Sequence, residues 1–248
     1  EFKTISEKKP GEELAETFDV SLMTVRRDLT LLEEQELINR YYGGATIRDF
    51  KHALNPQDRI AMCKSMIAEY ASRFLEDGDT IFINGSSTAL KMLEYAGSKT
   101  INVYTNNINA MKTEYPKNVK IHMTGGEVRG HVMIGDYVMS NLLNMHADKT
   151  FIGCAGVYDD GEFRYDIPTE IGINEAMIAR TRKDLYILAD HTKIQPRLSQ
   201  ENLYGSCIYD RQLTLITDDL ADAACIDNIK ATGISVVQIN TMKAEAAI

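Results

Sequence analysis

The chain has 248 residues, of which 44% are hydrophobic and 25% charged, values that are usual for a soluble globular protein. No apolar run approaches the roughly 20 residues that span a bilayer. The first residues show no secretory signal pattern, so we expect a cytoplasmic protein without membrane contact. A net charge of −9 excludes a protein that binds polyanions over its whole surface, and residues 1–59 alone hold 9 basic and 12 acidic residues. Any contact with DNA has to come from a few well-placed side chains.

The first 50 residues predict a helix, a turn, a second helix and a hairpin. Residues 12–18 carry apolar side chains four apart, and after a turn at 19–20 Ser21 is a good N-cap for the second helix. That helix runs to about Glu36 and has one buried stripe, formed by Leu22, Val25, Leu29 and Leu32. Gly43-Gly44 lies between β-prone residues and suits a two-residue hairpin turn. The outline is that of a winged helix-turn-helix.

Candidate DNA contacts lie on the second helix and in the hairpin. The first turns of a recognition helix enter the major groove, where an arginine can bond to guanine or to phosphate. Thr24 and Arg27 share a face, while Arg26 lies about 100° round the helix axis. Arg40 and the tyrosines after it suit contact with phosphate and sugar. On the residues alone, an equally good interpretation is that the paired arginines only form surface ion pairs with Asp28, Glu33 and Glu34.

The remainder of the chain predicts a linker and an α/β domain. We expect domains at 1–50 and 60–248, joined by a linker at 51–59, where the helical period lapses and Asn55-Pro56 disfavours a continuing helix. Apolar runs separated by helical stretches then predict a mostly parallel sheet covered on both faces. The strand-like runs are 80–84, 101–105, 119–124, 149–154, 184–190, 213–218 and 235–239. The helical stretches include 68–75, 89–95, 141–146 and 173–182.

Three expected strand ends of this domain carry small or amide-bearing residues, and ligands of parallel sheets bind at such ends. At the first, the strand runs through Asn84 into Gly85-Ser86-Ser87-Thr88 and a helix start. Backbone N–H groups, the helix dipole and hydroxyls there favour an anion. The nucleotide-binding glycine motifs are missing, so a single phosphate fits better. Capping of the helix is the simpler explanation of this turn by itself; the further strand ends Thr105-Asn106 and Thr124-Gly125-Gly126 favour a ligand.

We expect no metal and no cofactor. The four cysteines form no Cys-x-x-Cys pair and are expected to be reduced and mostly buried; they are Cys63, Cys154, Cys207 and Cys225. The five histidines show no spacing typical of metal ligands; they are His52, His122, His131, His146 and His191.

The N-terminal segment ELAETFDVSLMTVRRDLTLLEEQELINRYYGGA resembles the winged helix of the DeoR family of bacterial transcriptional repressors. That family has a VS-x-x-T-[IV]-RRDL-x-x-L-E core followed by an R-x-x-GGA wing, and Tyr42 stands where it usually shows His. The resemblance implies an operator DNA duplex as partner and a homodimer or homotetramer that presents several copies of the motif. The implied DNA contacts are Ser21, Thr24, Arg26, Arg27, Arg40, Tyr42, Gly43 and Gly44.

The second domain resembles the DeoR effector domain through DGDTIFINGSSTA, VYTNN, TGGEVRG, ADKTFIGCAGV, ADHTK and LITDD. This resemblance implies a fold similar to ribose-5-phosphate isomerase and a phosphorylated sugar or sugar alcohol as effector of a repressor of carbohydrate metabolism. It implies contacts from Gly85 to Thr88 and from Asn106, Gly125, Gly126 and Lys193, to which the strand ends add Asn84 and Thr105. Asn84 stands where the family commonly has Asp, and a Lys often found near Asn174 is missing.

Two other functions stay open. An isomerase-like enzyme would need a carboxylate base and a group that stabilises an enediolate. Lys193 could serve as the electrophile, and the candidate bases are Asp148, Asp159, Asp160, Asp166 and Glu170. We expect no catalysis, because acids in loops after strands are usually just solvated. A purely architectural DNA-binding protein is the third possibility and would not need a polar crevice.

Overall fold

The computed structural model describes residues 9–34, 38–41, 44–47, 55–165, 167–197 and 212–241. The chain divides into two compact units, residues 1–61 and residues 62–248. No helix among the described residues has the length and the apolar character needed to cross a membrane.

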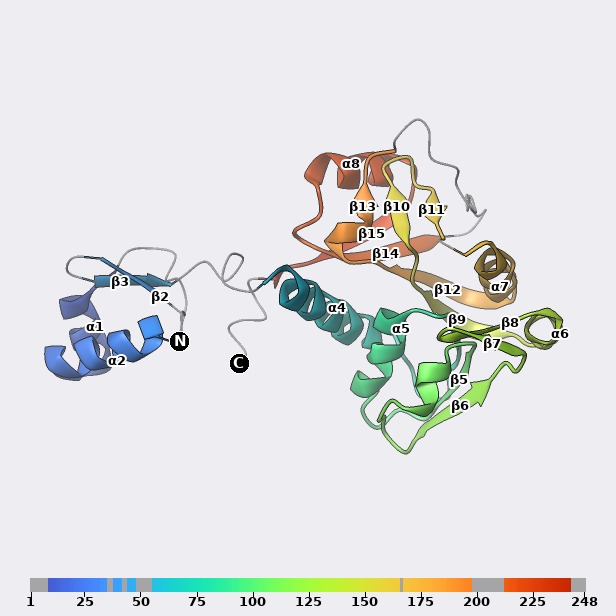
Figure 1. Cartoon of the computed structure of the whole chain (residues 1–248), viewed down its shortest axis with the longest axis horizontal. Coiled ribbons are helices and arrows are strands. Elements are labelled where there is room, and N and C mark those ends of the chain that lie inside the picture. The colour runs from blue at the N-terminus through green and yellow to red at the C-terminus, as the bar shows by residue number, and fades with distance from the viewer. Residues whose placement is uncertain are drawn as a thin grey trace. The chain divides into compact units, whose positions relative to one another are not determined.

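The first unit is a pair of helices with a small antiparallel sheet (Figure 1). The sheet has the strand order β1-β3-β2. In chain order the elements are β1 (Lys9–Pro10), α1 (Gly11–Phe18), α2 (Leu22–Glu34), β2 (Ile38–Tyr41) and β3 (Gly44–Ile47). This arrangement confirms the expected winged helix-turn-helix.

The turn between α1 and α2 is built as the residues predict. Asp19 ends α1 in the left-handed conformation with φ 53°, which Asp tolerates better than most residues. Ser21 then accepts a hydrogen bond of 3.1 Å from the backbone N–H of Thr24 and so caps α2. Val25 of α2 is buried. Phe18, which was expected on the apolar face of α1, is 51% exposed.

The second unit is built on a seven-stranded parallel sheet with the order β15-β14-β12-β9-β4-β5-β6. All seven apolar runs that predict strands fall in this sheet. In chain order its strands are β4 (Thr80–Ile83), β5 (Ile101–Thr105), β6 (Val119–Met123), β9 (Ala147–Ile152), β12 (Thr181–Leu188), β14 (Leu213–Asp218) and β15 (Ser235–Ile239). The strand order reverses between β4 and β9, and this switch point is where ligands of such sheets bind.

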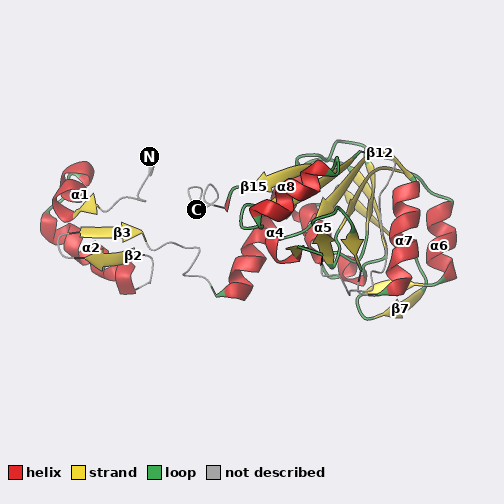
Figure 2. Cartoon of the chain, turned by 90° about the horizontal axis from the view of Figure 1, so that it is seen from above, coloured by secondary structure: helices red, strands yellow, loops and turns green. Residues whose placement is uncertain are grey.

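Helices cover both faces of the sheet, which explains why its central strand β4 and the second half of β12 are apolar at successive positions. Within β4, Ile81 and Ile83 join the apolar cluster under α4 and α5, whereas Phe82 joins the cluster under α6, α7 and α8. Figure 2 shows α6 and α7 side by side. The helices are α4 (Pro56–Ser72), α5 (Ser87–Lys91), α6 (Asp136–Leu143), α7 (Pro168–Ala179) and α8 (Ala223–Ala231).

Short elements complete the unit, and none of them was predicted as a separate element. A two-stranded hairpin pairs β7 with β8, and a three-stranded sheet has the order β11-β10-β13. These strands are β7 (Glu127–Arg129), β8 (Val132–Ile134), β10 (Gly156–Tyr158), β11 (Phe163–Arg164) and β13 (Ile194–Gln195). The 3-10 turns are η1 (Met92–Tyr95), η2 (Ile108–Met111) and η3 (His191–Lys193).

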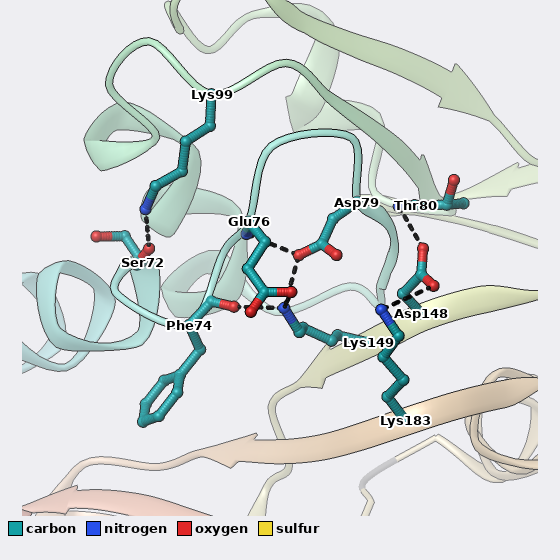
Figure 3. A network of polar contacts seen from close by, with 9 residues as sticks. All are labelled: Ser72, Phe74, Glu76, Asp79, Thr80, Lys99, Asp148, Lys149 and Lys183. Carbon is teal, nitrogen blue, oxygen red and sulfur yellow. Dashed lines mark hydrogen bonds and ion pairs between the residues drawn. The ribbon is translucent and has the colours of Figure 1, made fainter.

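A buried ion network holds the amino-terminal edge of the parallel sheet (Figure 3). Lys149 on β9 is 4% exposed and donates to Asp79 at 2.9 Å, to the Phe74 carbonyl oxygen at 2.8 Å and to Glu76 at 2.9 Å. Burial lowers the pKa of Lys149, but the bonds from Asp79 and Glu76 outweigh it, so the pKa is raised. The charged form of Lys149 is therefore part of the fold.

The predicted boundaries differ from the structure at α4, α6 and α7. The stretch 141–146 was expected to be helical, but α6 begins at Asp136 and ends at Leu143. The stretch 173–182 was expected to be helical throughout, but α7 ends at Ala179 and Thr181 begins β12, where it pairs with Ala147. Residues 56–59 of the expected linker lie in α4. Asn55 caps that helix by accepting a 2.9 Å bond from the Asp58 N–H, and Pro56 takes the first helical position, where its missing N–H is harmless.

One residue of the predicted hairpin turn lies in a strand instead. Tyr41 pairs with Gly44, so Gly44 opens β3, while Gly43 lies outside the described residues. The predicted Gly43-Gly44 turn is therefore wrong in register, because a glycine pair by itself does not show which of its members joins the strand.

Candidate functional site

Helix α2 presents an exposed polar stripe on the first unit. Leu22, Met23, Arg26, Arg27 and Thr30 together line a shallow hollow along this helix. Met23 is 78% exposed and both arginines are exposed, whereas Val25 on the opposite side is buried. The stripe is therefore available to an outside partner, as a recognition helix requires.

The N-terminal turn of α2 is held by its own hydroxyls. The Ser21 and Thr24 hydroxyl oxygens lie 2.8 Å apart, and Ser21 also accepts the capping bond. These two side chains, which were predicted to contact DNA, therefore stabilise the first turn of α2. Thr24 does not line the hollow with the arginines. Any ion pair of Arg26 or Arg27 with Asp28 or Glu33 would be an exposed pair, which contributes only about 0–1 kcal/mol and leaves the arginines able to exchange partners.

The structure describes only part of the predicted hairpin contacts. Arg40 lies in β2, paired with Ala45, and Gly44 is buried at the start of β3. Tyr42 and Gly43 lie outside the described residues.

In the second unit, Asn84 joins the two strands at the switch point. Its side-chain amide donates to the Gly153 carbonyl oxygen at 2.9 Å and to the Asn174 side-chain oxygen at 3.0 Å. Its own side-chain oxygen accepts from the N–H groups of Ser86 at 3.1 Å and Gly153 at 3.0 Å. An Asp, which has no amide to donate, could not make the first two bonds in its ionised form. This explains why Asn suits the position.

The predicted turn after β4 combines capping with close packing. Ser86, rather than Ser87 or Thr88, caps α5 by accepting a 3.1 Å bond from the Ala89 N–H. Ser87 is exposed and Thr88 is 3% exposed. The hydroxyl of Ser86 is thus used by the helix, as the capping interpretation expects, while that of Ser87 faces solvent.

Gly85 lies where other elements approach the turn. A methyl group at Gly85 would lie 2.5 Å from Val132 Cγ1, 3.5 Å from His131 Nε2 and 3.8 Å from Glu170 Oε1. The hairpin β7–β8 and the start of α7 therefore meet the β4 turn at this glycine. Gly153 is equally crowded, since a methyl group there would overlap Ser86.

The turn after β5 is tied to the turn after β4. Asn107 donates to the Ser86 carbonyl oxygen at 3.4 Å, and the Asn106 amide donates to the Met133 carbonyl oxygen at 3.1 Å. The Thr105 hydroxyl accepts from the Asn107 N–H at 3.0 Å. Asn106 is 1% exposed, and its side-chain oxygen has no hydrogen-bond partner among the described residues.

Gly125 and Gly126 have a structural reason to be glycine. Both have positive φ, 73° and 106°, a backbone region that other residues rarely adopt. A methyl group at Gly126 would lie 2.5 Å from the Ile134 carbonyl oxygen on β8. The Thr124 N–H, next to Gly125, donates to the Thr105 carbonyl oxygen at 3.0 Å, so this turn is joined to the end of β5.

Lys193, at the end of η3, donates to the Cys154 carbonyl oxygen at 2.6 Å. Cys154 follows Gly153, so this ammonium lies at the β9 end of the switch point. The structure thus brings together Asn84 to Ser86, Asn106 and Lys193 from the predicted set, around the carboxyl ends of β4, β5 and β9.

Several residues at this edge were not predicted as contacts, namely Asn107, His131, Gly153, Glu170 and Asn174. Asn174 is the most informative of them, because it is 1% exposed and its side-chain nitrogen has no partner among the described residues. A polar residue within the apolar helical run IGINEAMI was the available signal, since buried polar groups need a partner.

The carboxylates proposed for catalysis are mostly elsewhere. Asp148 lies at the amino-terminal edge, where it accepts from the Thr80 N–H at 3.0 Å and pairs with Lys183 at 3.4 Å. Asp159 and Asp160 bind the backbone and the guanidinium of Arg197. Glu170 alone of the described candidates lies beside the β4 turn, and Asp166 lies outside the described residues. Among the described candidates, Glu170 is therefore the one that could act as the base of the enzyme hypothesis at this turn.

The chain matches two family models that together span most of its length. Residues 11–50 match the DeoR-like helix-turn-helix domain, and residues 61–219 match the DeoR C terminal sensor domain. The chain belongs to the DeoR family. The family resemblance stated from the residues is thereby confirmed, and with it the class of helix-turn-helix transcriptional regulators.

Curated relatives agree with this membership. The chain is 30% identical to the HTH-type transcriptional regulator IolR of Bacillus subtilis over 222 residues, covering 85% of each protein. It is 31% identical to the glycerol-3-phosphate regulon repressor of Escherichia coli over 192 residues, covering 73% of this chain and 75% of the relative. These relatives are named as regulators of transcription rather than as enzymes.

Among solved structures, the second unit is similar to D-ribose-5-phosphate isomerase in complex with phospho-erythronic acid. That match has a TM-score of 0.40 and 14% identity, and covers 56% of this chain and 55% of the isomerase. At this level of similarity nothing about ligand or activity follows for the chain.

Proposed function

We propose that this DeoR-family protein is a repressor of carbohydrate-metabolism genes that binds operator DNA through α2 and its wing and releases or retains it according to a phosphorylated sugar or sugar alcohol. The single observation that carries the DNA half is the exposed stripe of Met23, Arg26, Arg27 and Thr30 on a capped helix whose other face is buried. An acidic protein can bind DNA in this way, because a rigid helix needs few arginines to read a groove.

Arg27→Ala tests the DNA half. A bidentate arginine–guanine contact is worth about 1–3 kcal/mol, so operator affinity should fall by roughly 5- to 150-fold while the melting temperature stays unchanged. Arg73→Ala is the matched control, since that arginine lies after α4 in the second unit and stacks on Tyr70 with its guanidinium carbon 5.2 Å from the ring centre. Equal operator affinity of Arg27→Ala and the wild type would remove Arg27 from the interface.

The effector half is supported by buried polar atoms at the switch point. The Asn106 side-chain oxygen and the Asn174 side-chain nitrogen are both buried and have no partner among the described residues. Leaving such groups unpaired costs about 1–3 kcal/mol each, a cost that a hydroxylated ligand would remove. Exposed Ser87, the backbone N–H groups at the start of α5 and the ammonium of Lys193 supply the anion-binding chemistry beside them.

The relative named for glycerol 3-phosphate makes that compound a suitable first member of the test panel. Operator binding by the full chain should be measured with glycerol 3-phosphate, pentose phosphates and hexose phosphates, each against its unphosphorylated form and inorganic phosphate. A tenfold change in operator affinity corresponds to about 1.4 kcal/mol of difference in effector binding between the free and DNA-bound states. An operator affinity that no compound alters contradicts the sensing claim and favours an architectural DNA-binding role.

Lys193→Met should weaken effector binding, because it removes the ammonium at the β9 end. Lys120→Met, at an exposed position of β6, is the matched control and should leave effector binding unchanged.

The same phosphates also address the enzyme alternative. Detectable interconversion of aldose and ketose phosphates by the wild-type chain would replace sensing with catalysis.

A further inference from the structure

A second group of ligand-type side chains lies at the carboxyl edge, beyond β12 and β14. Cys63 comes from α4, His191 from η3 and Asp218 from the end of β14, and their Sγ, imidazole nitrogen and carboxylate oxygen lie within 4.8 Å of one another. Cys63 and Asp218 are 0% exposed, and the His191 side chain is 19% exposed. Three parts of the chain far apart in sequence thus place one sulfur, one nitrogen and one oxygen donor around a common point.

The contact between His191 and Asp218 is close but is not a normal hydrogen bond. His191 Nδ1 lies 2.9 Å from Asp218 Oδ1, yet this buried nitrogen has no hydrogen-bond partner of acceptable direction among the described residues. The ring nitrogen and the carboxylate oxygen could instead both bind a cation placed between them.

The surroundings carry negative charge that no described Lys or Arg neutralises. Asp190, one residue before His191, is 1% exposed, and its Oδ2 has no partner among the described residues. Asp218 forms an ion pair with His191 but with no Lys or Arg of the described chain. Buried carboxylates are normally paired or bind metal ions, because burying an uncompensated charge is costly.

Neighbouring backbone groups already orient the carboxylate. The His191 N–H donates to Asp218 Oδ2 at 2.8 Å, and the Leu220 N–H donates to Asp218 Oδ1 at 3.1 Å. Such outer hydrogen bonds hold a carboxylate ligand in place around a metal ion. They equally serve to cap the strand end, so they support a metal site without requiring one.

We propose that Cys63, His191 and Asp218 bind a single zinc-type divalent ion, with water in the fourth position on the exposed side of His191. A thiolate with an imidazole and a carboxylate selects Zn²⁺ or a similar borderline ion, whereas Mg²⁺ and Ca²⁺ prefer oxygen ligands only. Tetrahedral Zn²⁺ holds its ligand atoms roughly 3.3–3.6 Å apart, so the His191 nitrogen and the Asp218 oxygen need to separate by about half an ångström.

Binding exchanges one proton for the ion. Burial first, and then the charge and hydrogen bond of Asp218, raise the pKa of the Cys63 thiol to about 12, so the metal-free thiol is protonated. The ion displaces that proton to solvent and forms the metal–sulfur bond, while His191 ligates through Nδ1, the ring nitrogen that faces Asp218. The ion would join α4 to η3, the turn that also carries Lys193.

Cobalt is the probe, because a cysteine thiolate bound to Co²⁺ gives a charge-transfer band and tetrahedral geometry gives strong visible absorption. The full chain is treated with a chelator, freed of it, and titrated with Co²⁺ and then with Zn²⁺. We expect one Co²⁺ per chain, both absorption features, displacement by Zn²⁺ but not by Mg²⁺, and a higher melting temperature with metal.

Cys63→Ala should abolish the thiolate band, and His191→Gln should weaken binding at least tenfold. Cys225→Ala is the matched control, since that thiol is also buried but lies on α8 beside Asp222. If Cys63→Ala does not fold, His191→Gln, at a partly exposed position, carries the test. A folded wild type without the band, a band that survives Cys63→Ala, or displacement by Mg²⁺ would overturn the proposal.

Discussion

Lys149→Met should destabilise the second unit strongly, because it removes the cation of a buried network. Asp79 is 4% exposed, and without Lys149 its carboxylate keeps the 2.8 Å bond from the Glu76 N–H but loses its charge partner. Removing one partner of a buried ion pair costs about 3–5 kcal/mol. At about 2–4 °C per kcal/mol for a unit of this size, the melting temperature should fall by roughly 6–20 °C.

Lys183→Met provides the comparison on the next strand (Figure 3). Lys183 is 54% exposed and pairs with Asp148 at 3.4 Å, and exposed pairs contribute only about 0–1 kcal/mol. Unfolding by guanidinium, followed by circular dichroism, measures the free energy of unfolding of Lys149→Met and Lys183→Met. The same measurement is made for Asp79→Asn and for the double variant Lys149→Met/Asp79→Asn. The double variant should recover part of the loss, because the orphaned charge is gone. A loss below about 1 kcal/mol for Lys149→Met, or strictly additive single effects, would refute this explanation.

Two further predictions concern backbone and pH. Gly126→Ala should lower the free energy of unfolding by about 1–3 kcal/mol through backbone strain at φ 106°, and the overlap with Ile134 adds to this loss. Gly130→Ala, at φ 63° in open space, should lower it by only about 1–2 kcal/mol. Urea unfolding of both variants measures the difference. The bond from the Thr80 N–H, with help from Lys183, lowers the pKa of Asp148 below its ordinary 3.8. Its contribution to stability is therefore present above pH 3.8 and is lost as the pH falls through the lowered pKa. Thermal unfolding between pH 2 and 7 should show the wild type losing its advantage over Asp148→Asn in this acid range, and an advantage independent of pH would contradict the assignment.

The large elements of this chain could be predicted because burial on both faces leaves a plain signal. A parallel strand covered by helices on both faces carries a short run rich in apolar residues, and all seven such runs became strands of the sheet. The winged helix was predictable for a different reason, since the cap at Ser21 is a local feature. Of the expected buried stripe on α2, Val25 is buried, whereas Leu22, Leu29 and Leu32 are half-buried.

What could not be predicted depends on contacts between distant segments. Strands of two or three residues, such as β7 and β13, are too short for any periodicity. The end of α7 was placed too late because β12 begins with the polar residues TRKD, which carry no apolar strand pattern that would mark where the helix stops. Lys149 lies in a strand that was predicted, but its burial depends on Asp79, 70 residues away. The group of Cys63, His191 and Asp218 likewise has no regular sequence spacing, so the positions of the histidines alone could not predict that these three side chains lie together.

The two edges of the parallel sheet satisfy their polar groups in different ways. At the amino-terminal edge, Lys149 meets two carboxylates and a carbonyl oxygen within the chain, so the network is closed. At the carboxyl edge, the side chains of Asn106, Asn174 and Asp190 each keep one buried polar atom without a partner among the described residues. Since an unpaired buried group lowers stability, an edge that keeps several of them is better explained by ligands that complete it than by folding alone. Stability should therefore respond most to substitutions at the first edge, and the response to ligands most to substitutions at the second.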